Sequence, residues 1–98
     1  MRVVWTISAL DHLARIFDYV ALDSPQYAKR LVDRITHRAD MLATFPNSGA
    51  KVLEFNEPTI REVIEGVYRI VYRVTDCVEV IAVFHAAQQL PPEPPESE

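Results

Sequence analysis

Residues 60–74, IREVIEGVYRIVYRV, contain the pattern that decides the fold. β-Branched and aromatic residues fill two runs, 60–64 and 68–74, and a turn-length gap containing Gly66 separates them. Two such runs joined by so short a gap are typical of an antiparallel β-hairpin. The pattern therefore predicts that this half of the chain is built from strands.

Three more short segments have the same β-forming character: 2–6, 51–55 and 78–84. From residue 51 onward, only turn-length gaps separate the segments. They therefore predict an antiparallel meander of four strands, preceded by one strand at the N-terminus.

Between the first strand and the meander, the apolar residues recur with a helical period. Ser8, with Asp11 three positions later, predicts the start of one helix, and Ser24 followed by Pro25 predicts the start of a second. Both helices have an apolar face: Leu10, Leu13, Ile16, Phe17 and Val20 in the first, and Ala28, Leu31, Val32, Ile35, Ala39 and Leu42 in the second. The order β-α-α-β-β-β-β predicts an α+β fold, with a helical hairpin packed on one face of an antiparallel sheet.

The composition is that of one globular domain. A chain of 98 residues, 49% hydrophobic and 24% charged, can bury a single core. We expect this domain to span residues 1–90. Residues 91–98 contain four prolines and three glutamates, which predicts a disordered acidic tail.

The sequence points to a cytoplasmic protein without a cofactor. Cys77 is the single cysteine, so it cannot form an internal disulfide. Neither the apolar stretch of a signal peptide nor a membrane span is present in the sequence. No Cys/His spacing resembles a zinc site, and we expect no metal.

The charge balance disfavours a protein that holds nucleic acid through its phosphates. The net charge is −4, but without the three tail glutamates residues 1–90 carry 10 basic and 11 acidic residues. Binding to phosphates usually requires a basic excess. A local patch remains an alternative to an ordinary solvated face on the second helix, which carries Lys29, Arg30, Arg34, His37 and Arg38.

Arginines inside strands are the first candidate functional residues. Period-2 geometry places Arg69 and Arg73 on one face of residues 68–74 and Tyr72 on the other, while Arg61 lies in the preceding strand. Such guanidiniums can bind phosphates, stabilise a phosphorane-like transition state or hold an acidic partner segment. The alternative is a set of ion pairs with carboxylates on neighbouring strands, for which the candidates are Glu54, Glu62 and Glu79.

The histidines are the second group. His85 ends the last strand, and simple alternation places it on the same face as Glu79. An imidazole there can transfer protons near neutral pH or act as a structural hydrogen-bonding group. We expect His12 and His37 at the surface of the helices, and an inert thiol at Cys77 in a turn.

These residues together resemble the ParE/RelE toxin superfamily over positions 3–90. The resemblance is carried by the order and spacing of Val4-Trp5-Thr6, Ile16-Phe17-Asp18-Tyr19, Ser24-Pro25, Leu42-Ala43-Thr44-Phe45-Pro46-Asn47-Ser48-Gly49, Ile60-Arg61-Glu62-Val63, Tyr68-Arg69-Ile70-Val71-Tyr72-Arg73 and Val80-Ile81-Ala82-Val83-Phe84-His85. It implies a β-α-α-β-β-β core. It also implies a toxin of a type II toxin–antitoxin system, neutralised by an antitoxin whose C-terminal segment wraps around it.

The superfamily resemblance leaves three activities open. RelE-like members cleave mRNA on the ribosome with basic residues and a C-terminal acid/base group, and here that set would be Arg61, Arg69, Arg73 and His85. ParE-like members, which include plasmid stabilization proteins, poison DNA gyrase. Residues 86–89, AAQQ, supply no tyrosine, lysine or second histidine, so we favour gyrase inhibition. A degenerate module that only binds an antitoxin is the third alternative.

The expected partner is a ParD-like or RelB-like antitoxin, in a hetero-oligomer with this chain. We expect acidic antitoxin residues to meet the strand arginines. The residues expected to bind the partner are Arg61, Arg69, Tyr72, Arg73 and His85.

Overall fold

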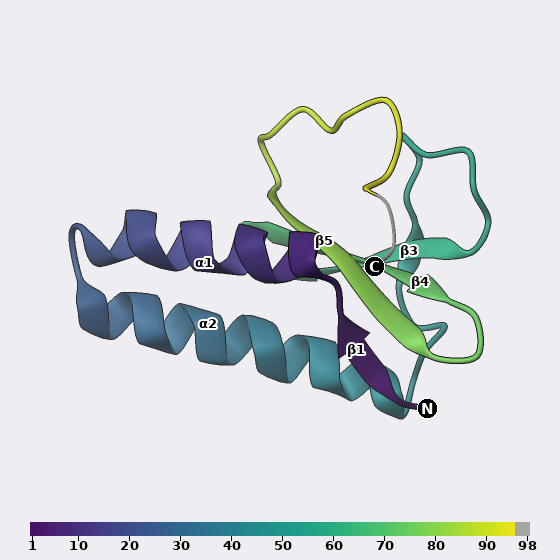
Figure 1. The fold of residues 1–98 in the computed structure, drawn as a ribbon, viewed down its shortest axis with the longest axis horizontal. Helices are drawn as coiled ribbons and strands as arrows, with labels where there is room; N and C mark the ends of the chain where they lie inside the picture. Colours follow the sequence, from purple (N-terminus) through teal and green to yellow (C-terminus); the bar gives the residue numbers. More distant parts are fainter. Residues whose placement is uncertain (96–98) are drawn as a thin grey trace.

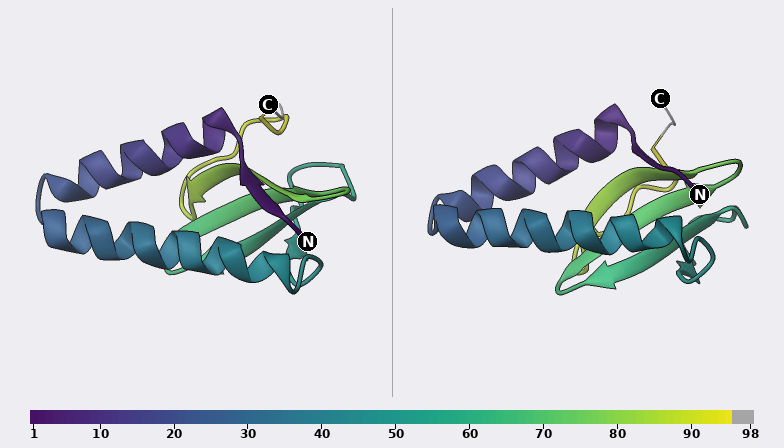
Figure 2. Two further views of the ribbon diagram at one scale, coloured as in Figure 1. Left: turned by 60° about the horizontal axis from the view of Figure 1, so that its bottom comes forward. Right: turned by 90° about the horizontal axis from the view of Figure 1, so that it is seen from below.

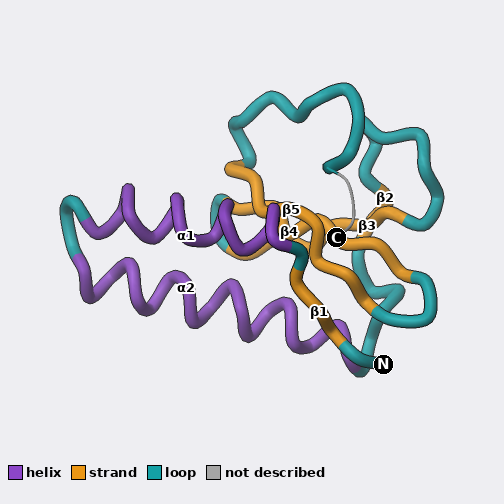
Figure 3. Tube along the Cα trace, viewed as in Figure 1, coloured by secondary structure: helices purple, strands orange, loops and turns teal. Residues whose placement is uncertain are grey.

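The computed structural model describes residues 1–95. Its elements are β1 (Val3–Trp5), α1 (Ile7–Ala21), α2 (Pro25–Asp40), the 3₁₀ turn η1 (Met41–Ala43), β2 (Ala50–Lys51), β3 (Ile60–Glu65), β4 (Tyr68–Val74) and β5 (Val78–His85). The helices α1 and α2 lie side by side, and the sheet lies beside them (Figure 1 and Figure 3). This confirms the predicted α+β fold and element order.

Both helices begin at side-chain caps, one of them two residues earlier than expected. Ser24 caps α2 by accepting a hydrogen bond from the Tyr27 backbone N–H, with Pro25 in the first turn, as predicted. The prediction that Ser8 caps α1 is wrong, because the Thr6 hydroxyl accepts from the Ala9 N–H at 3.1 Å. Thr6 has the extended backbone that a cap requires, whereas Ser8 already lies inside the helix.

The sheet is mixed and not wholly antiparallel. Its strand order is β1-β5-β4-β3-β2, and β1 pairs with β5 in parallel. The antiparallel prediction therefore holds for the pairs among β2, β3, β4 and β5 and fails for β1. The whole helical hairpin and the other strands separate β1 from β5 in the chain, which gives the long connection that parallel neighbours need.

The segment predicted as a strand over residues 51–55 forms only the short β2. The chain leaves the ladder after Lys51 and turns, with the Phe55 N–H donating to the Val52 carbonyl oxygen at 3.2 Å. The side chains of Val52 and Phe55 are buried. Their β-forming character thus reflects burial against the sheet and not pairing along its edge.

A β-bulge in β5 changes the predicted faces of that strand. Val71 pairs with Ala82 but Tyr72 pairs with Val80, so Ile81 is an extra residue. Alternation reverses at such an insertion. His85 pairs with Tyr68, so the two side chains lie on the same face of the sheet.

The bulge overturns one prediction. Glu79 pairs with Arg73, so it lies on the opposite face from His85. The prediction that His85 and Glu79 share a face is therefore wrong.

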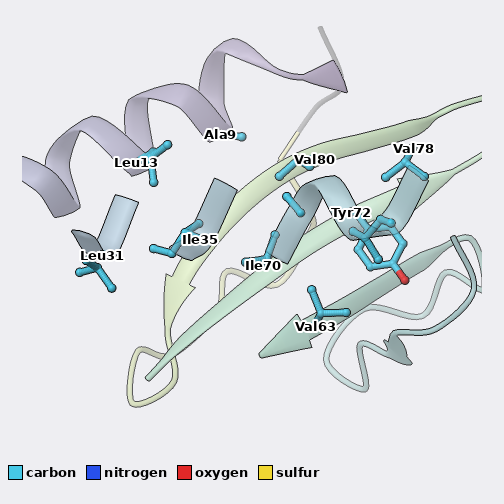
Figure 4. Packing of buried hydrophobic residues seen from close by; sticks show 11 residues of the cluster. Ala9, Leu13, Leu31, Ile35, Val63, Ile70, Tyr72, Val78 and Val80 are labelled. Carbon is cyan, nitrogen blue, oxygen red and sulfur yellow. The ribbon is translucent and has the colours of Figure 1, made fainter. Parts of the chain in front are cut away.

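The core has a layer on each face of the sheet. The helices cover one face, with α1 packed on β5 and α2 on β3 (Figure 2). Figure 4 shows the side chains between them, which include Leu13, Ile35, Ile70 and Tyr72. The opposite face, called here the open face, carries a second buried cluster: Val52, Phe55, Ile60, Val71, Ile81, Ala82, Phe84 and Leu90.

The domain boundary and the tail remain predictions. Leu90 is buried in the second cluster, which ties the segment after β5 to the open face. The predicted disordered tail begins at residue 91, and residues 96–98 lie outside the described part of the chain.

Candidate functional site

Arg69 is held by two carboxylates on the open face. Its Nε and Nη2 donate to Glu62 at 2.6 and 2.8 Å, and its Nη1 and Nη2 donate to Glu54 at 2.8 and 3.0 Å. Donating hydrogen bonds to Glu54 and Glu62 raises the pKa of Arg69, and accepting them from Arg69 lowers the pKa of Glu54 to about 2. The guanidinium of Arg69 is thus hydrogen-bonded to two carboxylates of the same chain.

Arg73 is also surrounded by carboxylates, at longer range. Its Nε lies 3.4 Å from a Glu57 oxygen, and its Nη1 lies 3.6 Å from a Glu79 oxygen. The two arginines of the open face thus meet four carboxylates, a formal charge of −2. The ion-pair alternative is therefore the one that the structure shows, and a phosphate or an acidic peptide would meet net repulsion here.

Arg61 and Tyr72 act together on a backbone segment. Arg61 Nη1 donates to the Gly49 carbonyl oxygen at 2.8 Å, and the Tyr72 hydroxyl accepts from the Gly49 N–H at 2.9 Å. Tyr72 is fully buried, and burial raises its pKa. A Cβ at position 49 would lie 2.5 Å from the Tyr72 hydroxyl, so only glycine fits between these groups. Tyr72 consequently presents no surface to a partner in this structure.

His85 lies apart from the strand arginines. It is exposed, its ring meets the Tyr68 ring edge-on at a centroid separation of 5.5 Å, and its Nδ1 accepts from the Ala87 N–H at 3.0 Å. On β4, Tyr68 pairs with His85 and Tyr72 pairs with Arg61. These two tyrosines lie four residues apart along the strand, which is about 13 Å.

The structure does not bring the four candidate nuclease residues together. Arg69 and Arg73 share the open face, whereas Arg61 and His85 lie on the helix side at different positions along β4. The four residues therefore do not form one cluster in this structure.

His12 is the functional candidate that the sequence analysis missed. Helical periodicity predicts it at the surface, but it is half-buried and its Nδ1 accepts from the Val83 N–H at 3.1 Å. Its ring also contacts Phe84, and burial lowers its pKa. Beyond Val80, β1 no longer pairs with β5, so this imidazole takes the place of a strand partner. Helical periodicity does not signal such a tertiary contact.

A hollow lies where α1 meets the end of β5. It has a volume of about 260 Å³ and is called here the histidine hollow. Its lining residues are His12, Arg15, Ile16, Tyr68, Val83, Phe84, His85 and Gln88. Both candidate imidazoles near the C-terminal strand therefore open into the same space.

The basic residues of α2 are exposed except for Arg38, which is half-buried. The guanidiniums of Arg30 and Arg34 lie 5.9 and 5.8 Å from the centroid of the Tyr27 ring, in cation–π contact. Arg34 also lies 3.7 Å from Glu65. Exposed interactions of this kind contribute little to stability.

Two kinds of feature are absent from the described residues. Over residues 1–95, no three His, Cys, Asp or Glu side chains gather as a metal site would require. The same part of the chain has no helix with the length and apolar character needed to cross a membrane. Cys77 is a free, half-buried thiol in the turn before β5.

Comparison with known proteins gives matches along nearly the whole chain. The family model described as the ParE toxin of the type II toxin–antitoxin system parDE matches residues 3–90. "Putative toxin Y4kP" of Sinorhizobium fredii is 37% identical over 92 residues, covering 92% of this chain and 93% of that protein. "Toxin RelE2" of Caulobacter vibrioides is 38% identical over 89 residues, covering 89% and 97%.

A solved structure shares the fold. A chain of the "Chromosomal ParDE TA system from P. aeruginosa" superposes with a TM-score of 0.71 at 25% sequence identity. The match covers 87% of this chain and 95% of that one.

Proposed function

The chain belongs to the ParE toxin family of type II toxin–antitoxin systems, and we propose that it inhibits DNA gyrase in the cytoplasm until a cognate antitoxin neutralises it. The family match over residues 3–90 and the similarity to a toxin solved as part of a ParDE system support this proposal.

The observation that carries the choice of gyrase is the state of the strand arginines. A nuclease of this fold needs cations directed at the phosphate that it cleaves and a nearby acid/base group. Here Arg69 and Arg73 are matched by four carboxylates, and His85 lies on the other face of the sheet. This arrangement favours inhibition of a protein target over hydrolysis of RNA.

Ribosome-dependent mRNA cleavage is the second candidate. One relative, at 38% identity, carries the name "Toxin RelE2". His85 and Arg61 would have to supply its chemistry, since both lie outside the carboxylate network.

The proposed partner is a ParD-like antitoxin, with a RelB-like one as the alternative, in a hetero-oligomer with this chain. Neutralisation by an antitoxin follows from membership of the type II toxin family. A segment that orders on a preformed toxin surface suits an inhibitor that must be released by proteolysis.

The test is to induce the chain without its antitoxin and follow DNA damage and mRNA integrity in the same culture. We expect DNA breaks with intact transcripts. Cleaved transcripts without DNA damage would favour the ribonuclease, and neither effect would favour a module that only binds its antitoxin.

A matched variant sharpens this test. His85→Gln removes proton transfer but keeps a polar side chain, and it should leave toxicity largely intact. Loss of toxicity in a folded His85→Gln chain that still binds antitoxin would instead support the nuclease, where removing an acid/base group costs about 10²–10⁴ in rate.

A further inference from the structure

The histidine hollow contains hydrogen-bond donors that lack acceptors. Backbone N–H groups bind Nδ1 of His12 and of His85, so each neutral ring carries its proton on Nε2. Among the described residues, no hydrogen bond occupies either Nε2. Both rings line the same hollow, and in its neutral form each has an N–H donor on Nε2.

Arg15 and Tyr68 add further donors to the hollow. Arg15 Nε lies 2.9 Å from an Asp11 carboxylate oxygen, and this ion pair between adjacent helical turns is exposed. The terminal nitrogens of Arg15 form no hydrogen bond within residues 1–95. Burial raises the pKa of Tyr68, which keeps the phenol protonated. An exposed pair such as Arg15–Asp11 is worth little, so a second carboxylate can join it or replace Asp11.

The walls of the hollow are apolar. Ile16, Val83 and Phe84 lie beside the donors. A ligand with an apolar stem and a planar pair of acceptor oxygens can contact the apolar walls and accept hydrogen bonds from the donors. An aspartate or glutamate side chain has this form.

We propose that the histidine hollow binds a carboxylate side chain of the antitoxin through His12, Arg15, Tyr68 and His85. This inference rests on the proposed antitoxin partner and names where its acidic residue is held. It places the acidic contact away from Arg69 and Arg73, whose carboxylate neighbours already exceed them in number.

Charge separates this ligand from a nucleic acid phosphate. Among residues 1–95, Arg15 is the one arginine or lysine that lines the hollow, and Asp11 offsets its charge. A nucleic acid backbone requires a track of cations, whereas a single carboxylate needs one cation and a few donors.

The experiment measures the affinity of the full-length chain for the antitoxin encoded with it, by calorimetry. His85→Asn retains an acceptor at the Nδ1 position and removes the Nε2 donor, whereas His85→Gln retains a donor near Nε2. We expect His85→Asn and Arg15→Gln each to weaken binding about tenfold, and the two together about a hundredfold. His85→Gln should lose less affinity than His85→Asn, because it keeps a donor near the Nε2 position.

Arg30→Gln is the matched control for charge, since it removes an exposed arginine from the outer face of α2, away from the hollow. Its affinity should stay within about twofold of the unaltered chain. A loss equal to that of Arg15→Gln would show general electrostatics and overturn the proposal. So would a folded His85→Asn/Arg15→Gln chain whose affinity is unchanged.

Two further outcomes are distinguishable. If the double variant keeps its antitoxin affinity but loses binding to a 20-nucleotide single-stranded DNA that the unaltered chain binds, the hollow is a phosphate site and the proposal fails. If the unaltered chain does not bind the antitoxin, the proposed partner itself is refuted.

A spectroscopic measurement does not depend on variants that fold. The imidazole Nε2 resonances of His12 and His85 should both shift when antitoxin is added to the ¹⁵N-labelled, unaltered chain. Unchanged resonances in a formed complex would overturn the proposal.

Discussion

At the scale of single residues, Arg69 stabilises the open face through its ion pairs with Glu54 and Glu62. Its side chain is 12% exposed and that of Glu62 is 13% exposed, whereas Glu54 is 44% exposed. Removing one partner of a poorly hydrated ion pair leaves the other without compensation, and this costs more than the pair itself contributes. Glu62 would be the carboxylate left behind.

We therefore expect Arg69→Met to lower the free energy of unfolding by about 2 kcal/mol, less than a fully buried pair would lose. Arg69→Met combined with Glu62→Gln should recover at least half of that loss, because the only carboxylate then left without Arg69 is Glu54, which is 44% exposed and stays hydrated. Urea unfolding of both variants measures the difference. A double variant less stable than Arg69→Met would contradict this account.

Glu54 makes part of the stability depend on acid. Its pKa in the folded chain is about 2, below the ordinary 4.5, so its contribution is complete above pH 4.5 and is lost as the pH falls through 2. We expect the stability difference between the unaltered chain and Glu54→Gln to shrink across this range. Chemical unfolding at several pH values tests it, and a constant difference would refute the Arg69–Glu54 pairing.

The sequence predicted single residues well wherever strand alternation was unbroken. It placed Arg69 and Arg73 on one face and named Glu54, Glu62 and Glu79 as their ion-pair partners. It failed at His85, because the extra residue Ile81 reverses alternation and no local pattern marks a bulge.

At the scale of elements, the contact between α1 and β5 explains why one edge of the sheet is closed by a helix. The Thr6 N–H donates to the Val80 carbonyl oxygen, and His12 accepts from Val83, so the start of α1 follows the edge of β5 beyond β1 (Figure 1). An open strand edge invites pairing with other chains. A helix that binds this edge removes that risk.

This contact predicts a second pH dependence. The pKa of His12 is lowered from 6.5 mainly by burial, so the folded chain resists its protonation. Stability is then complete above pH 6.5 and is lost as the pH falls through the lowered pKa.

His12→Asn isolates this effect, because its side-chain oxygen can accept from Val83 but does not titrate. We expect the free energy of unfolding to decline below pH 6.5 more steeply in the unaltered chain than in His12→Asn. His37 and His85 are common to both chains and cancel from the comparison. Equal slopes would show that His12 is not buried as described.

The elements that sequence analysis predicted least well depend on long-range packing. The helices and the β3–β4 hairpin follow from local periodicity and a two-residue turn in which Gly66 has a φ of 61°. The parallel pairing of β1 with β5 joins residues more than 70 positions apart, and the loss of a strand over residues 52–55 results from burial on the open face.

At the scale of the whole molecule, residues 1–95 cover both faces of the sheet, and within them the candidate residues Arg61, Arg69, Arg73 and His85 do not lie together. The helices lie on one face, and residues 52–55 with Leu90 pack on the other. Two arginines of the open face are neutralised by the chain's own carboxylates. Together with the family match, this charge balance supports our proposal that the chain inhibits DNA gyrase.

The most direct test is the supercoiling of relaxed plasmid by purified DNA gyrase in the presence of the purified, folded chain. We predict that the chain prevents supercoiling and that linear DNA accumulates. Gyrase should remain active when the antitoxin is added before the chain. Full supercoiling at a large molar excess of the folded chain, together with cleavage of mRNA on added ribosomes, would contradict the claim.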